Sequence, residues 1–593
     1  KFLSENGIKQ LMNETESTFL ADNQKLMPEA VAPLLFTIEE KNNQVELTEK
    51  GLKTLVLERG RMVRHIEDYP TASKAPWEFE FRGAVPIDKR SGLGAANWKR
   101  EETMHWALAE DEQPYIEEKP FRWFRGYHVG GKSLLWARGT QRWSDFDFEG
   151  PARDGYAVDW PIRYKDMEPW YTYVETFVGF AGSRDGLDVL PDQVVQPGFE
   201  LSCVERYYKE KLKEMYGSER HLVQGRCAHL TDPQQIHLDQ GRSKCMNQNM
   251  CNRGCIYGGY FSANASTLPW AEKTGNLTLR PDSVVESIIY DEQKGKAIGV
   301  RVIDRLTQES IEFYAKIIFV NASTINSNSI LLNSTSTRFP NGLGNDNGLM
   351  GKFITCHNYR GKGYATFEGF LDQVNLGRNP GHAYVPRFRN VYRQETDFLR
   401  GYAIGMSANR QLDGNGELIG DALREKLLDP GYGLWGMAAW MQGEMVPEES
   451  NHLRLSKDEK DKYGIPKLIL SVEWKENDNK MTRDFVEQQT EMYERMGFKN
   501  IKVEDTLPSC VTYTARSAKY LDVNGTMISS VSVAWASPTF TFPSTLILQP
   551  GESVELTVTV TRNANDQNKQ CCNPSARGSG ITNDASADVI SDV

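Results

Sequence analysis

The spacing of apolar residues predicts a mixed α/β protein. The run TLVLERG, residues 54–60, is β-branched and apolar and ends in an acidic residue and a glycine, as a buried strand and its turn would. Apolar positions recur at helical spacing from Asn479 to Met496, which predicts an amphipathic helix. Two further runs, Leu434 to Met445 and Leu468 to Trp474, have the pattern of strands.

The two ends of the chain differ from this middle part. Residues 1–48 are amphipathic and Lys/Glu-rich through Met27, and Leu34 to Ile38 then form an apolar run typical of a short strand. After Asp505 serine, threonine and valine dominate, and the alternation in VELTVTV, just after a Pro-Gly turn, predicts part of a β-sandwich. The last residues, 563–593, are rich in Asn, Ser, Asp and Gly, which predicts disorder.

Composition and charge argue against two classes of partner. The 593 residues are enough for several domains, and 39% hydrophobic with 25% charged residues is ordinary for a soluble protein. A net charge of −11 offers no basic surface to nucleic acid. The chain has no uninterrupted apolar stretch of about 18 residues, so we expect no membrane span. Lys1 to Asp22 do not form a signal peptide, so the chain as it stands is expected to be cytoplasmic.

Candidate chemistry begins at Glu58, which closes the run TLVLERG. In dinucleotide-binding α/β folds a carboxylate at the end of the second strand accepts hydrogen bonds from the adenosine ribose. The alternative is a surface glutamate in a strand-end turn. The segment Phe124 to Trp143, FRGYHVGGKSLLWARGTQRW, favours the first interpretation. Its glycine pair, Gly130 and Gly131, lets backbone N–H groups approach a phosphate or a cofactor ring closely.

This block resembles the first signature of the glucose-methanol-choline (GMC) oxidoreductases, the segment that lies against the diphosphate and isoalloxazine of FAD. Its continuation, LLWARGTQRWSDFDF, is more similar to the pyranose oxidase and gluconate dehydrogenase branch than to the glucose oxidase branch. Further segments resemble the family in the same order along the chain, and the resemblance covers about residues 46–504. These segments are Asn276 to Asp304, Ile317 to Asn333, Asn341 to His357 and Pro447 to Asn479.

The resemblance implies an α/β fold, α+β overall. It consists of an FAD-binding Rossmann-like domain interrupted by a substrate domain with an antiparallel sheet, followed here by a short β-rich C-terminal segment. The flavin is expected to be non-covalent, because Leu135 stands where some members carry a flavin-linked histidine. The backbone of Val285 is expected to meet the adenine. The residues expected to bind FAD are Glu58, Gly126, Val129, Gly130, Gly131, Lys132, Ser133, Trp136, Val285, Asn321 and Ala322.

The family oxidises the CH–OH group of an alcohol, with a base taking the hydroxyl proton while hydride passes to the flavin. The resemblance therefore implies an FAD-dependent dehydrogenase or oxidase that acts on a small-molecule sugar, polyol or related alcohol. A dehydrogenase would also need an electron-acceptor protein as a partner.

Three clustered cysteines, Cys245, Cys251 and Cys255, suggest a metal or an iron–sulfur centre, since such ions prefer soft sulfur ligands. Some bacterial sugar dehydrogenases of the family carry a three-iron cluster on a similar spacing. The alternative is reduced or paired structural cysteines in a loop beside the flavin. A cluster here would favour a dehydrogenase over an oxidase.

Two parts that the family chemistry needs are missing from the sequence. Family members begin with a strand, a GxGxxG turn and a helix that hold the FAD diphosphate, whereas LLFTIEEKNNQV precedes ELTEKG here. The family's catalytic histidine block follows the amphipathic helix, but this chain has no histidine after His452, so its catalytic residues are unknown. His105, His128 and His357 have no companion motif and are expected to be structural.

The foreign ends suggest a composite protein. Residues 1–46 resemble an internal fragment of the translocase motor SecA and carry none of its nucleotide-binding loops, and the C-terminal tail resembles part of a β-sandwich module. The leading hypothesis is a family enzyme with impaired catalysis. The alternative is a non-catalytic composite or binding scaffold that retains a remnant flavin fold. The expected parts are a SecA-like segment (1–46), an FAD-binding domain with inserted substrate-domain segments (47–360), a substrate domain (361–504), a β-sandwich-like fragment (505–562) and a disordered tail (563–593).

Overall fold

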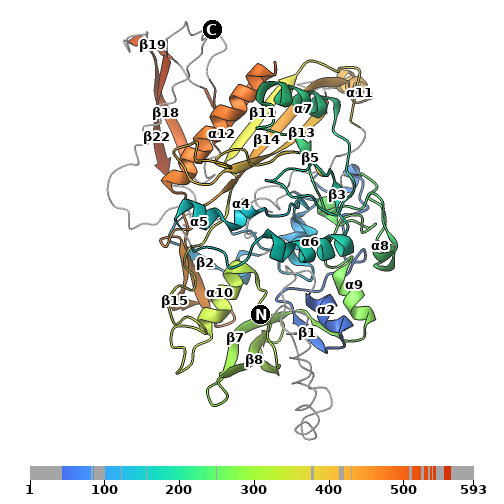
Figure 1. Cartoon of the computed structure of the whole chain (residues 1–593), viewed down its shortest axis with the longest axis vertical. Coiled ribbons are helices and arrows are strands. Elements are labelled where there is room, and N and C mark those ends of the chain that lie inside the picture. The colour runs from blue at the N-terminus through green and yellow to red at the C-terminus, as the bar shows by residue number, and fades with distance from the viewer. Residues whose placement is uncertain are drawn as a thin grey trace.

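The computed structural model describes residues 43–81, 85, 100–107, 109–119, 121, 123–156, 158–248, 250–375, 380–412, 420–428 and 431–505, and the backbone of strands between 511 and 562. The strand expected at Leu34 to Ile38 and the disorder expected at 563–593 lie outside these residues. Within them the chain is mixed α/β (Figure 1), which confirms the predicted fold class.

Helices and strands alternate along the described chain. The helices are α2 (Asn43–Glu49), α4 (Asp145–Phe148), α5 (Gly150–Asp154), α6 (Tyr164–Val178), α7 (Cys203–Tyr216), α8 (Gln235–Asp239), α9 (Thr267–Lys273), α10 (Ser323–Asn333), α11 (Gly420–Leu428) and α12 (Glu476–Arg495). Short 3₁₀ turns span Pro76–Glu78, Met104–Trp106, Glu110–Glu112, Gly131–Leu134 and Cys251–Arg253.

Most strands are short. They are β1 (Thr54–Leu57), β2 (Tyr115–Glu117), β3 (Ala181–Gly182), β4 (Gln196–Pro197), β5 (Val223–Gln224), β6 (Leu277–Arg280), β7 (Ser283–Asp291), β8 (Lys296–Asp304), β9 (Ser310–Tyr314), β10 (His357–Asn358), β11 (Gly361–Phe367), β12 (Ala383–Val385), β13 (Tyr402–Leu412), β14 (Tyr432–Glu444), β15 (His452–Lys460), β16 (Pro466–Ser471), β17 (Lys499–Asp505), β18 (Val511–Leu521), β19 (Met527–Val531), β20 (Ala534–Ala536), β21 (Thr539–Thr541) and β22 (Ser553–Arg562).

The buried strand β1, near the start of the described chain, pairs in parallel with the more exposed strand β6. All four residues of β1 are buried, and the strand runs beside β6 in the register Thr54↔Leu277. Helix α2 leads into β1 and packs on α9, where the Gln44 side chain donates a 2.9 Å hydrogen bond to the Thr267 hydroxyl. The strand predicted from TLVLERG is confirmed.

A three-stranded antiparallel sheet, β7-β8-β9, lies in the lower part of Figure 1. Helix α10 and the residue after it contact this sheet. The Ser334 hydroxyl accepts the Ile288 N–H at 2.7 Å, and the Asn333 side chain donates to the Glu286 carbonyl at 3.0 Å. The paired strands predicted between Asn276 and Asp304 are therefore confirmed.

The largest sheet has seven strands in the order β17-β11-β14-β13-β12-β5, with β10 also pairing with β14. Every neighbouring pair is antiparallel. The two longest strands, β13 and β14, pair from Tyr402↔Gly443 to Leu412↔Tyr432. This is the antiparallel sheet that the sequence predicts.

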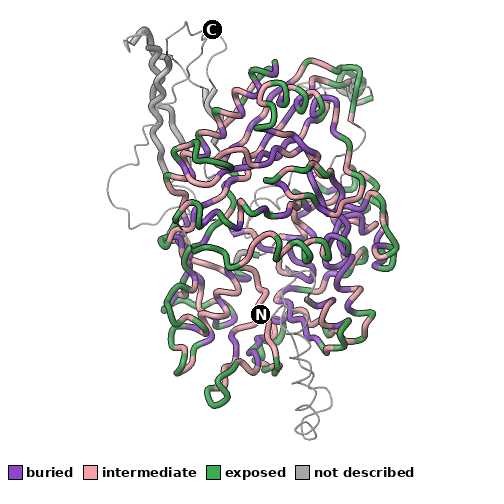
Figure 2. The backbone as a smooth tube through the Cα atoms, in the orientation of Figure 1, coloured by how far each residue is buried: buried purple, intermediate pink, exposed green. Residues whose placement is uncertain are grey.

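Helices α12 and α7 cover one face of this sheet (Figure 1). Phe485 and Met481 of α12, both 0% exposed, belong to the same core as Met437 and Met441 of β14. Buried residues, purple in Figure 2, run along these strands beneath the helices. The amphipathic helix predicted at Asn479 to Met496 is confirmed as α12, which begins three residues earlier.

A smaller sheet joins the segment before the glycine-rich block to strands from the later part of the chain. Strand β2, which precedes the glycine-rich block, pairs in parallel with β16, and β15 lies on the other side of β16. At the C-terminal end β18 pairs with β19 and β22, and β20 pairs with β21. These strands make the segment β-rich as expected, whereas the β-sandwich remains a prediction. No helix in the described ranges is long and apolar enough to cross a bilayer.

Candidate functional site

Strand β1 ends at a buried carboxylate, Glu58. This residue is 5% exposed, and its backbone N–H donates to the Arg280 carbonyl at 3.0 Å. Its carbonyl accepts the Ser283 N–H at 2.8 Å, and its side-chain Oε1 accepts the Gly60 N–H at 2.7 Å. These bonds fix the carboxylate at the carboxyl end of a parallel strand, where α/β sheets bind their ligands.

Gly60 brings the exit of β1 against the glycine-rich block. A Cβ at Gly60 would lie 1.9 Å from the Tyr127 carbonyl carbon, so only glycine permits this approach. Directly after it, the Val129 N–H donates to the Arg61 carbonyl at 2.9 Å. The block therefore runs beside the residues that follow Glu58.

The block turns sharply at Gly130, before the 3₁₀ turn Gly131–Leu134. Gly130 has a φ of +91°, and a Cβ there would lie 1.6 Å from Asn264 Oδ1. The Asn264 side chain donates to the carbonyls of Val63 at 2.7 Å and Val129 at 3.0 Å. One buried amide thus clamps the turn to the segment after β1.

A cavity of about 110 Å³ opens where β1, the glycine-rich block, β7 and α10 meet. Four segments that are distant in sequence contribute predicted residues to its wall. The predicted cofactor residues that line it are Glu58, Gly126, Gly131, Lys132, Val285 and Ala322.

Other predicted residues lie behind this wall and support it. The Ser133 hydroxyl donates to the Gly130 carbonyl and accepts the Ala263 N–H at 3.0 Å. The Trp136 indole donates to the Phe261 carbonyl at 3.1 Å. The side chains of Ser133 and Trp136 therefore support the wall and do not line the cavity. The predicted residues outside the cavity wall are Val129, Gly130, Ser133, Trp136 and Asn321.

Three polar residues of the cavity wall were not among the predicted site residues. Gln113, Tyr127 and Asn326 form a closed network in which the Tyr127 hydroxyl donates to the Gln113 amide oxygen. Asn326 donates to Tyr127 at 3.0 Å, and Gln113 donates to Asn326 at 3.0 Å. Tyr127 and Asn326 lie within segments that resemble the family, so the signal for them was their place in those segments, whereas Gln113 lies outside every such segment.

A second cluster closes the rim of the cavity. Arg59 stacks between the rings of Tyr127, at 5.1 Å, and Tyr463, at 5.3 Å. Glu112 accepts hydrogen bonds from Tyr463 at 2.6 Å and from Lys462 at 2.8 Å. Burial opposes ionisation of Glu112, but these hydrogen bonds outweigh it and lower the pKa of the carboxyl. The rim therefore carries a fixed negative charge held by cations.

The buried histidines beside the site are neutral near pH 7. Burial lowers the pKa of both His105 and His128 to about 4. Their rings lie on either side of Trp106, with centroids 4.1 Å and 5.1 Å from its ring. His128 Nδ1 also hydrogen-bonds the Val129 carbonyl at 3.1 Å. These contacts agree with the structural role expected for them.

The face of the large sheet that points away from α7 and α12 carries polar and aromatic side chains. Lys362 and Tyr384 occupy this face with Trp440, because Lys362 pairs with Trp440, and Gly405 pairs with both Trp440 and Tyr384. Burial lowers the pKa of Lys362 and raises that of Tyr384. We refer to Lys362, Tyr384 and Trp440 as the open face.

An ion-pair network joins the sheet to the segment that follows the glycine-rich block. Arg387 lies 3.2 Å from Glu444, at the end of β14, and 3.6 Å from Asp147 of α4. Burial raises the pKa of Glu444, and Arg387 opposes that rise. The network places the end of the sheet next to the continuation of the block.

Comparison with known proteins agrees with this arrangement. Residues 117–357 match the family described as GMC oxidoreductase, and this range contains the glycine-rich block, β7 and α10. This part of the chain is therefore similar to the GMC oxidoreductases. The resemblance inferred from the order of the motifs is thereby confirmed.

Named GMC relatives cover a larger region. The chain is 26% identical over 406 residues to 2-methyl-1,2-propanediol dehydrogenase of Mycolicibacterium austroafricanum, covering 64% of this chain and 69% of that protein. It is 25% identical over 352 residues to the fructose dehydrogenase large subunit of Gluconobacter japonicus, covering 57% of this chain and 60% of that protein. Among solved structures, pyridoxine 4-oxidase from Mesorbium loti matches 81% of this chain and 83% of that chain, with a TM-score of 0.46 and 15% identity.

A separate short match involves the translocase. The chain is 62% identical over 53 residues to the protein translocase subunit SecA of Amoebophilus asiaticus, covering 9% of this chain and 5% of that protein. The SecA resemblance is therefore confirmed as a local one.

Similarity to the GMC family supports FAD as the cofactor, and the residues present fit one end of it. His128 Nε2 and Asn321 Nδ2 are buried and have no hydrogen-bond partner among the described residues, and such atoms are usually satisfied by a ligand or water. The cavity of about 110 Å³ is smaller than the roughly 300 Å³ of a small cofactor pocket. Glu58 and Val285 fit the adenosine end of FAD, whereas the diphosphate turn has no counterpart in the sequence.

The structure does not support the expected iron–sulfur cluster. Cys245, Cys251 and Cys255 are free thiols, and the described ranges contain no group of three or more His, Cys, Asp or Glu side chains placed to hold a metal ion. Burial raises the pKa of Cys245 to about 11, which favours the thiol over the thiolate that metals bind. Cys251 Sγ instead lies 3.8 Å from His229 Nε2.

Proposed function

We propose that the chain is an FAD-dependent oxidoreductase that acts on the CH–OH group of a sugar, polyol or related alcohol, with impaired catalysis. The observation that carries the proposal is the convergence of Glu58, Gly131, Lys132 and Val285 on one cavity within a GMC family framework. Motif residues from distant segments meet at one site because the fold that they serve is retained.

Each cavity residue has a role in this proposal. Glu58 accepts hydrogen bonds from the ribose hydroxyls, because it ends β1 as a buried carboxylate. The backbone of Val285 meets the adenine, and the absence of side chains at Gly126 and Gly131 lets the backbone approach the cofactor. When bound, FAD supplies the hydride acceptor for alcohol oxidation.

The open face is proposed as the substrate side. Trp440 offers an aromatic surface, Lys362 a donor and Tyr384 a hydroxyl, a combination suited to a small polyhydroxylated molecule. The Arg387 network supports this placement, because it holds the sheet against the continuation of the glycine-rich block. The relatives named as a propanediol dehydrogenase and a fructose dehydrogenase favour an alcohol or sugar substrate.

Impairment follows from two features of the sequence. No GxGxxG turn precedes TLVLERG, so the diphosphate lacks the backbone N–H groups and helix dipole that usually hold it. Residues 453–593 contain no histidine, so none of them supplies the family's late histidine as the base that takes the hydroxyl proton. We expect weak FAD binding and slow turnover.

The domain division is part of the same proposal. Residues 47–360 contribute the flavin-binding half, although β5 and β10 within this range belong to the large sheet. Residues 361–504 supply the rest of that sheet and α12. This arrangement supports the proposed interruption of one domain by the other.

Dye-coupled oxidation tests the enzymatic proposal. The full chain is incubated with FAD and an electron-accepting dye, and dye reduction is measured with 2-methyl-1,2-propanediol, fructose and sorbitol. We expect slow, FAD-dependent reduction that falls in Trp440→Ala. The matched control is Trp77→Ala, a tryptophan that is 76% exposed, which should keep the rate. Loss of rate in both variants would contradict the assignment of the open face.

A non-catalytic flavin scaffold is the second candidate. The small cavity and the missing histidine block favour it. It predicts that FAD binds but that no substrate reduces the dye at any concentration. Substrate-dependent reduction above that of free FAD would exclude it.

A further inference from the structure

A second cavity, of about 750 Å³, lies at the edge of the large sheet where β13 extends past β12. Its volume is within the range of small-molecule sites. It shares no lining residue with the flavin cavity. We call it the edge cavity. The residues that form its wall are Phe199, Glu200, Leu201, Ser202, Cys203, Glu205, Arg206, Asn247, Gln373, Val374, Asn375, His382, Ser407, Ala408, Asn409 and Trp435.

Buried hydrogen bonds fix the wall of the edge cavity. Glu205, 2% exposed, accepts the Ala408 N–H at 3.0 Å and the Ser202 N–H at 2.7 Å. Asn375 donates to the Ala408 carbonyl at 3.2 Å and accepts the Arg410 N–H at 2.8 Å. These side chains occupy the edge of β13 that β12 leaves unpaired after Met406. The wall is therefore built before any ligand arrives.

Three other polar side chains on the wall remain available to a ligand. Gln373, Ser407 and Asn409 make no side-chain hydrogen bond within the part of the chain that the structure describes. Ser407 and Asn409 lie two residues apart on β13 and so share one face of the strand. Each of the three groups both donates and accepts hydrogen bonds, as a ligand hydroxyl does.

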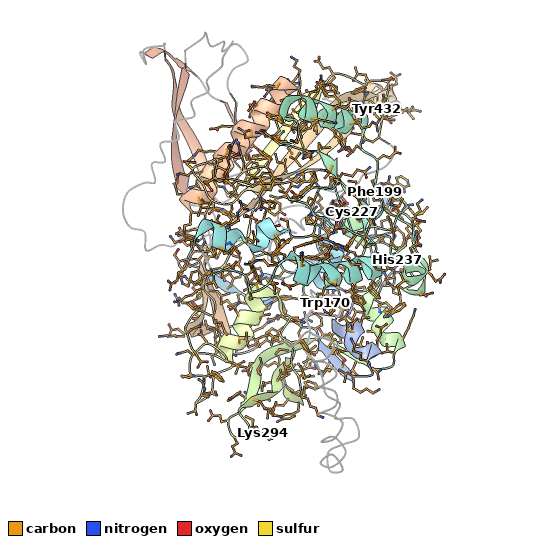
Figure 3. The ribbon with its side chains drawn as sticks, in the orientation of Figure 1. Trp170, Phe199, Cys227, His237, Lys294 and Tyr432 are labelled. Carbon is orange, nitrogen blue, oxygen red and sulfur yellow. The ribbon has the colours of Figure 1, made fainter. Side chains whose placement is uncertain are left out.

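Aromatic rings complete the lining. Phe199 precedes α7 and lies below Tyr432 of β14 in the view of Figure 3. Trp435 donates its indole N–H to the Phe370 carbonyl at 3.0 Å and is only 1% exposed, so it backs the wall and offers a ligand almost no ring surface. The Phe199 ring beside amide and hydroxyl groups matches a molecule with C–H faces and hydroxyl edges.

The charges on the wall do not favour an ion. The basic Arg206 shares the wall with two carboxylates, Glu200 and Glu205, and the Glu205 carboxylate is already held by two backbone N–H groups. An anion would meet two carboxylates, and a cation would meet the Arg206 guanidinium. A neutral ligand avoids both penalties.

From this geometry we propose that the edge cavity binds a neutral sugar or polyol, at a site separate from the flavin cavity. Gln373, Ser407 and Asn409 hydrogen-bond its hydroxyls, and Phe199 contacts its C–H faces. The inference does not rest on the proposed oxidoreductase function, because the two cavities share no residue.

Isothermal titration of the full chain with sorbitol tests the inference, with gluconate as a charged comparator. We expect saturable sorbitol binding and weaker gluconate binding. Asn409→Leu and Gln373→Leu should each weaken sorbitol binding about threefold to tenfold, because each removes one hydrogen-bonding side chain. The matched control, Gln293→Leu, changes an exposed glutamine in the turn between β7 and β8 and should bind as the wild type does.

Misfolding of a variant and binding of sorbitol in the flavin cavity are each tested by a separate measurement. Thermal melting of each variant shows whether it is folded, and Ser407→Ala provides a smaller change if a leucine variant melts early. Saturating FAD should leave the sorbitol affinity unchanged. The inference is overturned if sorbitol does not saturate, if all folded variants bind as the wild type does, if gluconate binds more tightly, or if FAD competes with sorbitol.

Discussion

The half with the large sheet and the half that contains β1 and the glycine-rich block differ in how completely their strands are paired and covered. The large sheet has seven strands, a continuous core and two covering helices. The half that contains Glu58 has, among its described residues, the short parallel pairs β1–β6 and β3–β4 and the three-stranded sheet β7-β8-β9, and it relies on loops and single side chains such as Asn264 to hold its glycine-rich block. The comparison teaches that a binding site can keep its wall residues in place while its sheet remains incomplete.

The edge of β1 illustrates this difference. The N–H groups of Thr54 and Glu58 point to β6, so those of Leu55 and Leu57, on alternate residues, point the other way. No described residue forms a backbone hydrogen bond with this edge, although both leucines are buried. Buried backbone groups are normally paired, so we expect this half to be less stable and to gain more from a bound ligand.

The largest expected effect is in the sheet half. Phe485→Ala removes a 0% exposed ring between α12 and the sheet and should lower the free energy of unfolding by about 3–5 kcal/mol. Leu57→Ala in β1 should cost about 2 kcal/mol, the low end for such a change, because its surroundings can collapse. Urea unfolding measures both. A larger loss for Leu57→Ala would break the comparison.

The next largest effect is expected at Glu58, the carboxylate proposed to bind the ribose. Glu58→Gln replaces a charged acceptor with a neutral one and should weaken FAD binding roughly tenfold to hundredfold, because hydrogen bonds to charged groups contribute about 1.5–3 kcal/mol. Fluorescence titration with FAD measures the affinity. Glu219→Gln, at an exposed position, is the matched control. Equal affinity in both variants would remove Glu58 from the site.

Substitution of Gly130 is expected to have an effect comparable to or smaller than that of Glu58→Gln. Gly130→Ala forces a side chain into a backbone with a φ of +91° and against Asn264 Oδ1, so we expect a loss of about 1–3 kcal/mol in stability together with weaker FAD binding. Gly139→Ala is the matched control, because no atom lies within 4 Å of the added Cβ. Urea unfolding of both variants is decisive, and equal stability would show that the turn is not clamped.

The smallest effect concerns pH. His128 titrates near its ordinary pKa of about 6.5 in the unfolded chain but at about 4 in the folded one, so the unfolded state binds more protons between these values. Stability should therefore fall as pH decreases from about 6.5 towards 4, by on the order of 1 kcal/mol at pH 5.5 for this residue. Urea midpoints across this range should change less in His128→Gln. An equal slope in both proteins would contradict a buried neutral imidazole.

Strands and helices with a regular pattern of apolar residues could be predicted from the sequence, whereas contacts between distant segments could not. TLVLERG and the helix Asn479 to Met496 gave elements within a few residues of β1 and α12, because all four residues of β1 are buried and α12 buries one face. The network of the wall residues Gln113, Tyr127 and Asn326 could not be predicted, since it exists only after three distant segments meet.

The cysteine loop shows a case in which residue spacing alone does not identify a metal site. The spacing of Cys245, Cys251 and Cys255 suggested metal ligands, but spacing does not determine whether thiols converge or ionise. Similarly, five of the predicted cofactor residues lie outside the cavity wall, and contact of the predicted set with the cofactor stays a prediction.

Equilibrium binding of FAD to the purified full chain, followed by the flavin absorption bands, shows whether the cavity beside Glu58 binds flavin. We expect bands that co-purify or return on adding FAD, shifted from those of free FAD and diminished in Glu58→Gln. A protein that shows no perturbed flavin spectrum at any FAD concentration, while its sheet half remains folded, would contradict the claim that the cavity beside Glu58 is a flavin site.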